Sequence, residues 1–233
     1  MKINKMAVAI GLMILIFLVF VPLIQASRRR HQIPEPHQQI TIILDAGHGG
    51  KDGGASSRDG LVERDLVLEV TRMVEEHLRL QGFNVILTRE GDEDLASPHA
   101  RNRKREDLSR RVEILNTTED AIAISIHANA ITNSRWSGAQ TFYDPSSLEN
   151  RELATALMMG LRANLDGLDR IERPISNLYI LRHSTIPTAL VEIGFLSNPE
   201  EARLLADEDY QRLIAYAIFE GILLYIEGVE INP

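Results

Sequence analysis

The chain has 233 residues, with 25 lysines and arginines against 33 aspartates and glutamates and a formal net charge of −8. Five basic residues and no acidic one lie in residues 1–30, so the remaining 203 residues carry a net charge of −13, which argues against nucleic-acid binding driven by phosphate neutralisation. The absence of cysteine excludes disulfides, thiolate zinc ligands, cysteine nucleophiles and lipid attachment at cysteine.

Met6 to Ile24 is an uncharged, almost wholly apolar stretch of 19 residues. A stretch of ~20 apolar residues can span a bilayer, whereas the core of a signal peptide is ~7–15 residues long. We therefore expect residues 1–26 to be an uncleaved membrane anchor, with a cleaved signal peptide as the alternative. Residues 27–39 are polar, contain Pro34 and Pro36, and are expected to form a linker.

From residue 40 onward, short apolar runs alternate with stretches of helical periodicity. Strands are expected at Ile40–Asp45, Asn84–Leu87, Ala121–Ile126, Gly138–Tyr143, Leu178–Leu181 and Thr188–Ile193. Helices are expected at Glu63–Leu80, Asp107–Asn116, Glu149–Leu165 and Tyr210–Ile226. This alternation predicts a single α/β domain over residues 40–230, with a mixed, mainly parallel sheet of about six strands and helices on both faces.

Four polar residues associated with these elements are candidates for a metal site. His48 lies in a glycine-rich segment, Glu63 begins the first helix, His127 directly follows a strand and Glu192 lies within an apolar run. Because sites in such sheets collect at the carboxyl ends of strands, these residues are expected to converge on one edge. A catalytic zinc usually has three histidine or carboxylate ligands and an open position for water, and His48, Glu63 and His127 supply such a set. Glu192 is then placed to move the proton of the attacking water to the leaving nitrogen.

The two histidines and Glu63 also have simpler structural explanations. A lone histidine after a strand is more often a loop residue than a ligand, and a glutamate at a helix start is favourable with the helix dipole. Glu69, Glu75 and Glu76 are alternatives to Glu63, although they lie along the helix flank where solvated charges are expected. Glu192 is harder to explain in this way, because a carboxylate inside an apolar strand is costly to bury without a partner.

Three segments of the chain carry a resemblance to a known family: Ile43–Gly50, Ser125–Ala130 and Leu190–Asn198. In these segments the chain resembles the zinc-dependent N-acetylmuramoyl-L-alanine amidases called Amidase_3, and the similarity runs from about Thr41 to Ile226. The resemblance implies Zn²⁺ on His48, Glu63 and His127 and a catalytic role for Glu192. It also implies cleavage of the amide between N-acetylmuramic acid and the first L-alanine of the peptidoglycan peptide.

Three further residues are candidates near this site. Arg182 matches an arginine common in the family, which implies contact with a substrate carboxylate or orientation of Glu192; the alternative is a surface arginine at a strand end. Asp45 precedes the first ligand by three residues and is expected either to orient it or to cap its loop. Asn129 is expected either to hold the substrate or to fix its own loop.

The stretch from His127 to Gly138 is short. Some division amidases insert a blocking helix at this place, and the present chain has no room for one, so we expect a site that is not inhibited by such an insert. As a compact, anchored member of the family, the chain resembles the germination-specific amidases of spore-forming bacteria. These prepare muramic-δ-lactam in spore-cortex peptidoglycan by removing the peptide, which the resemblance implies for this chain.

The implied peptidoglycan substrate lies outside the membrane, so we expect an extracytoplasmic enzyme that is anchored or secreted through its N-terminal segment. The arginines at 28–30 favour the opposite orientation by the positive-inside tendency, and the location of the substrate overrides them. Two alternatives remain open: a non-catalytic, membrane-anchored peptidoglycan-binding protein, and a zinc peptidase or deacetylase of the cell wall. The sequence does not specify whether an accessory protein takes part.

Overall fold

Six strands form one mixed sheet in the computed structural model, which describes residues 40–228. The strands are β1 (Thr41–Ala46), β2 (Asn84–Leu87), β3 (Ala121–Asn129), β4 (Gln140–Tyr143), β5 (Arg173–Pro174) and β6 (Thr188–Phe195). Their spatial order is β2-β1-β3-β6-β4-β5, with β2, β1, β3 and β6 parallel, β4 antiparallel to β6, and β5 parallel to β4. The predicted mixed, mainly parallel sheet is therefore confirmed.

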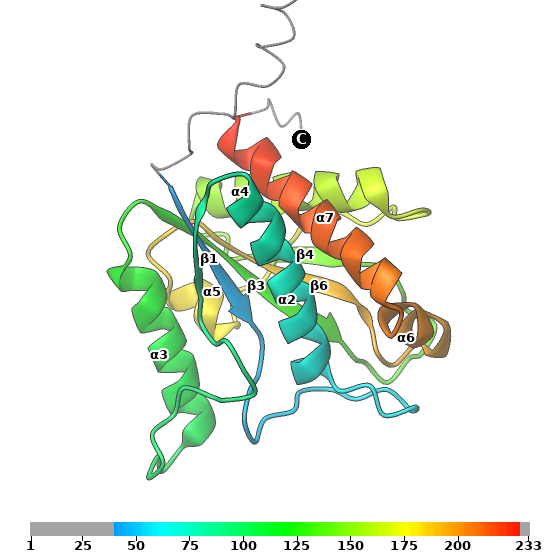
Figure 1. The fold of residues 1–233 in the computed structure, drawn as a ribbon, viewed down its shortest axis with the longest axis horizontal. Helices are drawn as coiled ribbons and strands as arrows, with labels where there is room; N and C mark the ends of the chain where they lie inside the picture. The colour runs from blue at the N-terminus through cyan, green and yellow to red at the C-terminus, as the bar shows by residue number, and fades with distance from the viewer. Residues whose placement is uncertain (1–39, 229–233) are drawn as a thin grey trace, which may run out of the picture. The chain divides into compact units, whose positions relative to one another are not determined.

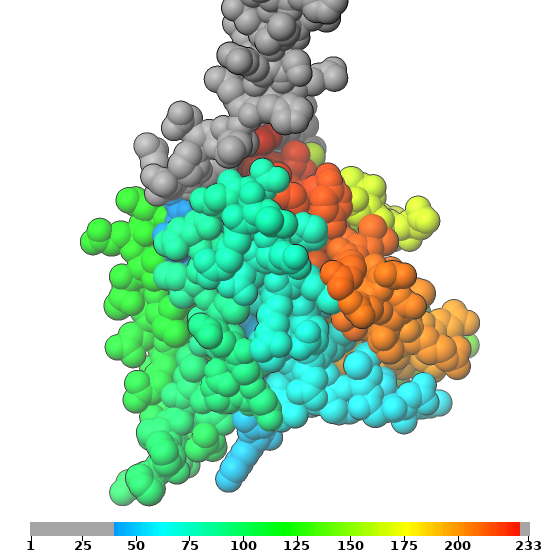
Figure 2. Space-filling model, in the orientation of Figure 1, coloured from blue at the N-terminus to red at the C-terminus, as the bar shows by residue number. Residues whose placement is uncertain are grey.

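Helices cover both faces of the sheet. They are α2 (Glu63–Leu80), α3 (Arg103–Thr117), α4 (Leu148–Asn164), α5 (Tyr179–His183), α6 (Pro199–Leu205) and α7 (Glu208–Ile226). The larger core lies on the face covered by α2, α4 and α7, and a smaller core lies on the face covered by α3 and α5. Figure 1 shows α2 and α7 crossing in front of the strands, and in the space-filling view of the same side these helices and the adjoining loops hide nearly all of the sheet (Figure 2).

The alternation of side chains along the strands decides which face carries the polar residues. In β1, Ile42 and Leu44 join the larger core and Ile43 joins the smaller one, so the next residue on the smaller-core face is Asp45. The same alternation brings Ser125 and His127 of β3 to the face of α3 and α5. A row of polar side chains thus extends the smaller core at the carboxyl ends of the parallel strands.

The prediction of one strand is wrong. The residues Leu178–Leu181 form no strand; Leu178 is the N-cap of the short helix α5, and Ile180 and Leu181 are buried in the smaller core. A four-residue apolar run fits a buried helical turn as well as a strand, so its pattern could not separate the two. The two-residue strand β5 at the sheet edge and the helix α6 were not expected, although Asn198 before Pro199 is a common helix start.

Two strands continue further than expected. β3 extends to Asn129 and β6 to Phe195, so His127 lies inside its strand and not just beyond it, and Glu192 lies inside its strand as expected. The expected anchor or signal segment (residues 1–26) and linker (27–39) lie outside the described residues. Within residues 40–228, no helix combines the length and apolar character needed to cross a bilayer.

Candidate metal centre

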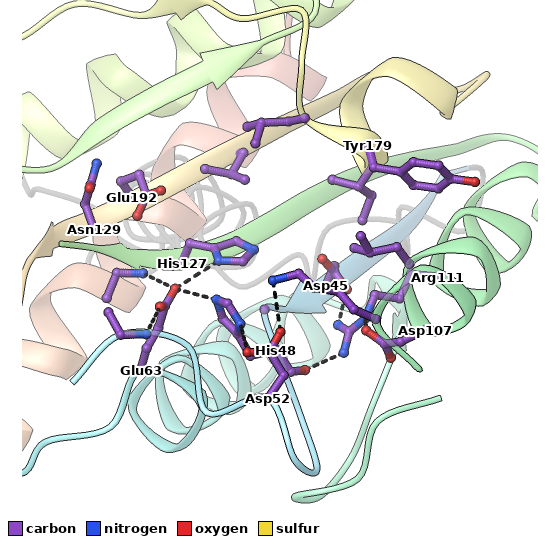
Figure 3. Close-up of a pocket in the computed structure, with 18 of the residues that line it drawn as sticks. Asp45, His48, Asp52, Glu63, Asp107, Arg111, His127, Asn129, Tyr179 and Glu192 are labelled. Carbon is purple, nitrogen blue, oxygen red and sulfur yellow. Dashed lines mark hydrogen bonds and ion pairs between the residues drawn. The ribbon is translucent and has the colours of Figure 1, made fainter. Parts of the chain in front are cut away.

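Three side chains from distant parts of the sequence meet at the carboxyl edge of the sheet. His48 Nε2 lies 3.1 Å from Glu63 Oε1, and His127 Nδ1 lies 3.0 Å from the same oxygen. One ligand atom from each of the three residues falls within 4.8 Å of the other two. Figure 3 shows both imidazoles directed at the Glu63 carboxylate. The structure therefore brings together the three residues expected to bind the metal.

Glycine allows this close packing at two positions. A Cβ on Gly47 would lie 2.3 Å from the His127 ring, and a Cβ on Gly54 would lie 2.5 Å from Glu63 Oε2 and 2.7 Å from His48 Cδ2. Any side chain at either position would push a ligand out of place. The glycine-rich segment around His48 is thus explained by contacts of the three-residue cluster as well as by the turn of the chain.

Glu63 is the first residue of α2, is buried, and is fixed by backbone donors. Its Oε2 accepts a hydrogen bond from Ala55 N at 2.8 Å, and its Oε1 accepts one from Ala128 N at 3.1 Å. Burial by itself would raise the pKa of Glu63, but hydrogen bonds and charge from His127 and His48 outweigh it and hold the pKa well below its usual range. Glu63 is therefore a carboxylate, the form that binds metals.

Asp52, which the sequence did not indicate, contacts the other nitrogen of His48. Its Oδ1 lies 3.1 Å from His48 Nδ1, and its Oδ2 lies 3.3 Å from Lys104 Nζ. This contact fixes the imidazole ring and leaves Nε2 facing Glu63, an arrangement common for metal-binding histidines. A spacing of four residues has no geometric meaning inside an irregular loop, so only the folded chain reveals the pair.

Asp45, which was expected to orient the first ligand or cap its loop, makes its side-chain contacts with residues other than His48. It accepts hydrogen bonds from Ser125 Oγ at 2.6 Å, from Thr88 Oγ1 at 2.7 Å and from Arg111 Nη1 at 2.7 Å. Its contacts are with buried residues behind the cluster, whereas Asp52 contacts the His48 ring.

Glu192 lies beside the cluster on the neighbouring strand. It is the register partner of His127 in the pairing of β3 with β6, so both side chains leave the sheet on the same face. Its Oε2 is buried and has no hydrogen-bond partner among residues 40–228. Burial raises the pKa of Glu192 to about 7, partly offset by the nearby His127. A buried, unpartnered carboxylate oxygen of this kind is costly unless it serves a ligand or a reaction.

These residues line one pocket with a volume of about 360 Å³. The metal-site residues and Glu192 lie at one end with Asn129, and Tyr179 lies at the other end (Figure 3). Lys104 and Leu108 also line this pocket. Arg182 lies on α5, is exposed, and does not line this pocket. Its expected contact with substrate or with Glu192 stays a prediction.

The donor set fits a zinc ion. Ligand atoms about 2.0–2.1 Å from a tetrahedral zinc lie about 3.3 Å from one another, close to the 3.0 and 3.1 Å that separate the two imidazole nitrogens from Glu63 Oε1. Two histidines, one carboxylate and an adjacent pocket are also the ligand pattern of catalytic rather than structural zinc sites.

The connection from β3 to β4 contains no helix in the described chain. Residues 130–139 form a loop, which agrees with the expectation that no blocking helix is inserted here. That the site is free of self-inhibition by such an insert stays a prediction.

Comparison with known proteins relates this arrangement to a family. Residues 42–223 match the family Amidase_3, N-acetylmuramoyl-L-alanine amidase. The chain is 46% identical over 187 residues to the germination-specific N-acetylmuramoyl-L-alanine amidase of Bacillus subtilis, covering 79% of this chain and 78% of that protein.

Two solved structures share the fold. The CwlD amidase from Clostridioides difficile, in complex with the GerS lipoprotein, has a TM-score of 0.78 at 40% identity, covering 81% of this chain and 98% of that chain. The catalytic domain of CwlV, an N-acetylmuramoyl-L-alanine amidase from Bacillus (Paenibacillus) polymyxa, has a TM-score of 0.71 at 30% identity, covering 82% and 99%.

Proposed function

The chain belongs to the Amidase_3 family of N-acetylmuramoyl-L-alanine amidases, and we propose that it hydrolyses its peptidoglycan substrate with one zinc ion held by His48, Glu63 and His127 and with Glu192 as the proton-transfer group. The observation that carries this proposal is the convergence of four residues on one pocket. Three of them offer ligand atoms to a common point, and the fourth has a buried carboxylate oxygen without a partner.

The proposed mechanism assigns a defined task to each side chain. When bound, zinc would polarise the amide carbonyl and acidify the attacking water. Glu192 takes a proton from this water as the water attacks, and the protonated carboxyl then gives the proton to the nitrogen of L-alanine. The amide C–N bond breaks, the lactyl group of muramic acid keeps a carboxylate, and the peptide leaves with a free amine. Asn129, at the rim of the same pocket, is placed to hold the substrate.

We propose spore-cortex peptidoglycan as the substrate and muramic-δ-lactam formation as the process. The support is the 46% identity to the germination-specific amidase over most of both chains. The relative from Clostridioides difficile was solved with a lipoprotein, so a lipoprotein is the proposed accessory partner. Its recovery with the full chain purified from native membranes would support this, and an amidase that is fully active on its own would count against it.

We also propose a domain organisation for the whole chain. Residues 40–230 are the zinc amidase catalytic domain, residues 27–39 a linker, and residues 1–26 the membrane anchor or signal segment. The apolar stretch from Met6 to Ile24 supports an extracytoplasmic enzyme, anchored or secreted through this segment. Family membership argues against a peptidase or deacetylase, and the presence of all four candidate site residues argues against a non-catalytic binding protein.

Digestion of purified walls tests the reaction and the substrate together. The full chain, supplied with zinc, is incubated in parallel with vegetative and spore-cortex peptidoglycan, and the products are identified by mass. We expect released peptides with free L-alanine amino ends and greater release from cortex. Cleavage within the peptide or loss of acetyl groups would contradict the amidase reaction, and equal release from both walls would contradict the cortex preference.

A further inference from the structure

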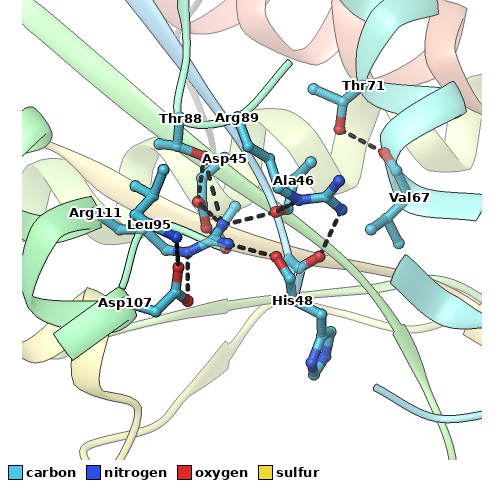
Figure 4. Close-up of polar contacts among 12 residues, drawn as sticks. Asp45, Ala46, His48, Val67, Thr71, Thr88, Arg89, Leu95, Asp107 and Arg111 are labelled. Atoms are coloured by element: carbon cyan, nitrogen blue, oxygen red, sulfur yellow. Dashed lines mark hydrogen bonds and ion pairs between the residues drawn. The ribbon is translucent and has the colours of Figure 1, made fainter. Parts of the chain in front are cut away.

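We propose that the buried arginines Arg89 and Arg111 are positioning residues that hold the backbone of His48 in the conformation that binds the metal. This inference rests on the proposed metal centre. The two residues lie behind the pocket, and together their guanidinium groups contact the carbonyl oxygens of three successive residues, Ala46, Gly47 and His48 (Figure 4). These carbonyls belong to the segment that leads from β1 to the first ligand.

Arg89 is almost wholly buried and bonds only to backbone carbonyls. It donates from Nε to Ala46 O at 2.9 Å and from Nη2 to Gly47 O at 2.8 Å. The same side chain reaches Arg64 O at 2.8 Å, in the first turn of α2, and Gly91 O at 2.7 Å. It forms no ion pair within the described residues. Asp45 and Glu93 attract its charge without forming an ion pair with it. Burying a cation that pairs with no carboxylate is costly, so its contacts need a reason.

Arg111 is equally buried and approaches the segment from α3. Its Nη1 donates to Ala46 O at 2.7 Å, and its Nη2 donates to His48 O. Two carboxylates hold its guanidinium in place: Asp45 on Nη1 at 2.7 Å and Asp107 on Nε at 2.9 Å. The planar fork of arginine suits this geometry because several donors are fixed relative to one another.

The backbone at His48 explains why such contacts are needed. His48 has a φ of 62°, in the left-handed region, where a residue with a Cβ is disfavoured by about 1–2 kcal/mol. Gly49 and Gly50, with φ of 143° and 55°, continue the turn. Through this turn the imidazole points at Glu63 and His127. Hydrogen bonds from the arginine pair to the carbonyls of residues 46–48 hold this strained conformation before any metal arrives.

A purely structural role makes a different prediction from a positioning role. If the arginine pair only stabilised the fold, its loss would lower the melting temperature and leave the zinc affinity of the folded protein unchanged. If it positions His48, the folded variants bind zinc more weakly. Mutation of residues that orient metal ligands typically weakens metal binding 10–100-fold.

The test measures zinc affinity in the full chain by competition with a chromophoric chelator. The variants are Arg111→Lys and Arg89→Lys, which keep the charge but lose the fork. Leu115→Ala is the matched control, because Leu115 is fully buried on the same helix as Arg111, one turn further along, and has an apolar side chain in the smaller core that cannot hydrogen-bond to the carbonyls of residues 46–48. Circular dichroism establishes the temperature at which each protein is folded.

We expect Leu115→Ala to lower the melting temperature without a change in zinc affinity, and both arginine variants to bind zinc at least tenfold more weakly at a temperature where they are folded. If Arg111→Lys does not fold, the Arg89→Lys result decides. Zinc affinity within twofold of wild type in the folded arginine variants, or an equal loss in Leu115→Ala, would overturn the inference. Absence of zinc binding by the wild type would instead refute the proposed metal centre.

Discussion

Glu192 and His127 are register partners on adjacent parallel strands, β6 and β3, and both side chains leave the sheet on the same face. Neighbouring strands lie about 4.8 Å apart, so backbone hydrogen bonding sets the spacing between a proposed metal ligand and the proposed proton-transfer group. The buried Oε2 of Glu192, without a partner in the described chain, lies in the pocket with the metal-site residues. This relationship leads to predictions that separate catalysis from metal binding.

Glu192→Gln should remove activity and leave the metal. The amide has the shape of the carboxylate but cannot accept the proton of the water, and proton transfer by a positioned group contributes 10²–10⁴-fold to rate. We expect a loss of at least 100-fold in release of L-alanine peptides, with one zinc still bound per chain. Peptide release near the wild-type rate in this variant would exclude Glu192 from proton transfer.

Glu63→Gln should lose zinc, because a neutral amide is a poor ligand and cannot pair with two imidazoles. The control is Glu76→Gln on the same helix, where the side chain is exposed on the flank of α2. We expect metal analysis to find zinc in the control and wild type but little in Glu63→Gln. Equal zinc in both variants would show that Glu63 is not a ligand.

Asp52→Ala should weaken zinc binding without preventing folding. Asp52 fixes His48 through Nδ1 and is itself partly exposed, so its removal frees the ring while the core stays intact. We expect a 10–100-fold weaker affinity by chelator competition and a small change in melting temperature. Unchanged affinity would show that the glycine-rich turn alone orients the imidazole.

The stability of the metal-free protein should depend on pH through Glu192. Its pKa is raised from an ordinary value of 4.5 to about 7 in the folded state, so the folded state holds its proton more tightly than the unfolded state. The contribution of protonated Glu192 to the free energy of unfolding is fully present below pH 4.5. It is lost as the pH rises through 7, and the loss is roughly 3 kcal/mol for a pKa shift of this size.

Glu192→Gln carries no such charge and should therefore melt at a higher temperature than wild type at pH 8 and at a similar temperature at pH 5. Thermal melts of both proteins in the presence of a chelator measure the difference. A wild type that is more stable than the variant at pH 8 would contradict a buried Glu192 Oε2 without a partner.

Much of the fold could be predicted from sequence patterns that extend over many consecutive residues. The eighteen residues of α2 begin and end as predicted, because apolar residues recur at helical spacing along the whole segment. The apolar start of β3, residues 121–124, favours a buried strand, and β3 lies inside the sheet between β1 and β6. The short run at Leu178–Leu181 was misread as a strand because four apolar residues carry no period, and tertiary packing against α3 decides in favour of the helix.

The candidate site, like the fold, could be predicted from the sequence only in part. His48, Glu63 and His127 could be found because each stands next to a distinctive segment, and the structure brings them together. Asp52, Arg89 and Arg111 could not, because their importance comes from contacts between segments far apart in the sequence or inside an irregular loop. The distance between Arg111 and the His48 carbonyl along the chain is 63 residues, and no local pattern encodes it.

The most direct test of the metal centre is anomalous diffraction at the zinc absorption edge from crystals of the zinc-loaded protein. We predict a single strong peak about 2.0–2.2 Å from His48 Nε2, Glu63 Oε1 and His127 Nδ1. A zinc peak beside other residues, or no peak in a protein that is active on peptidoglycan, would contradict the proposed metal centre.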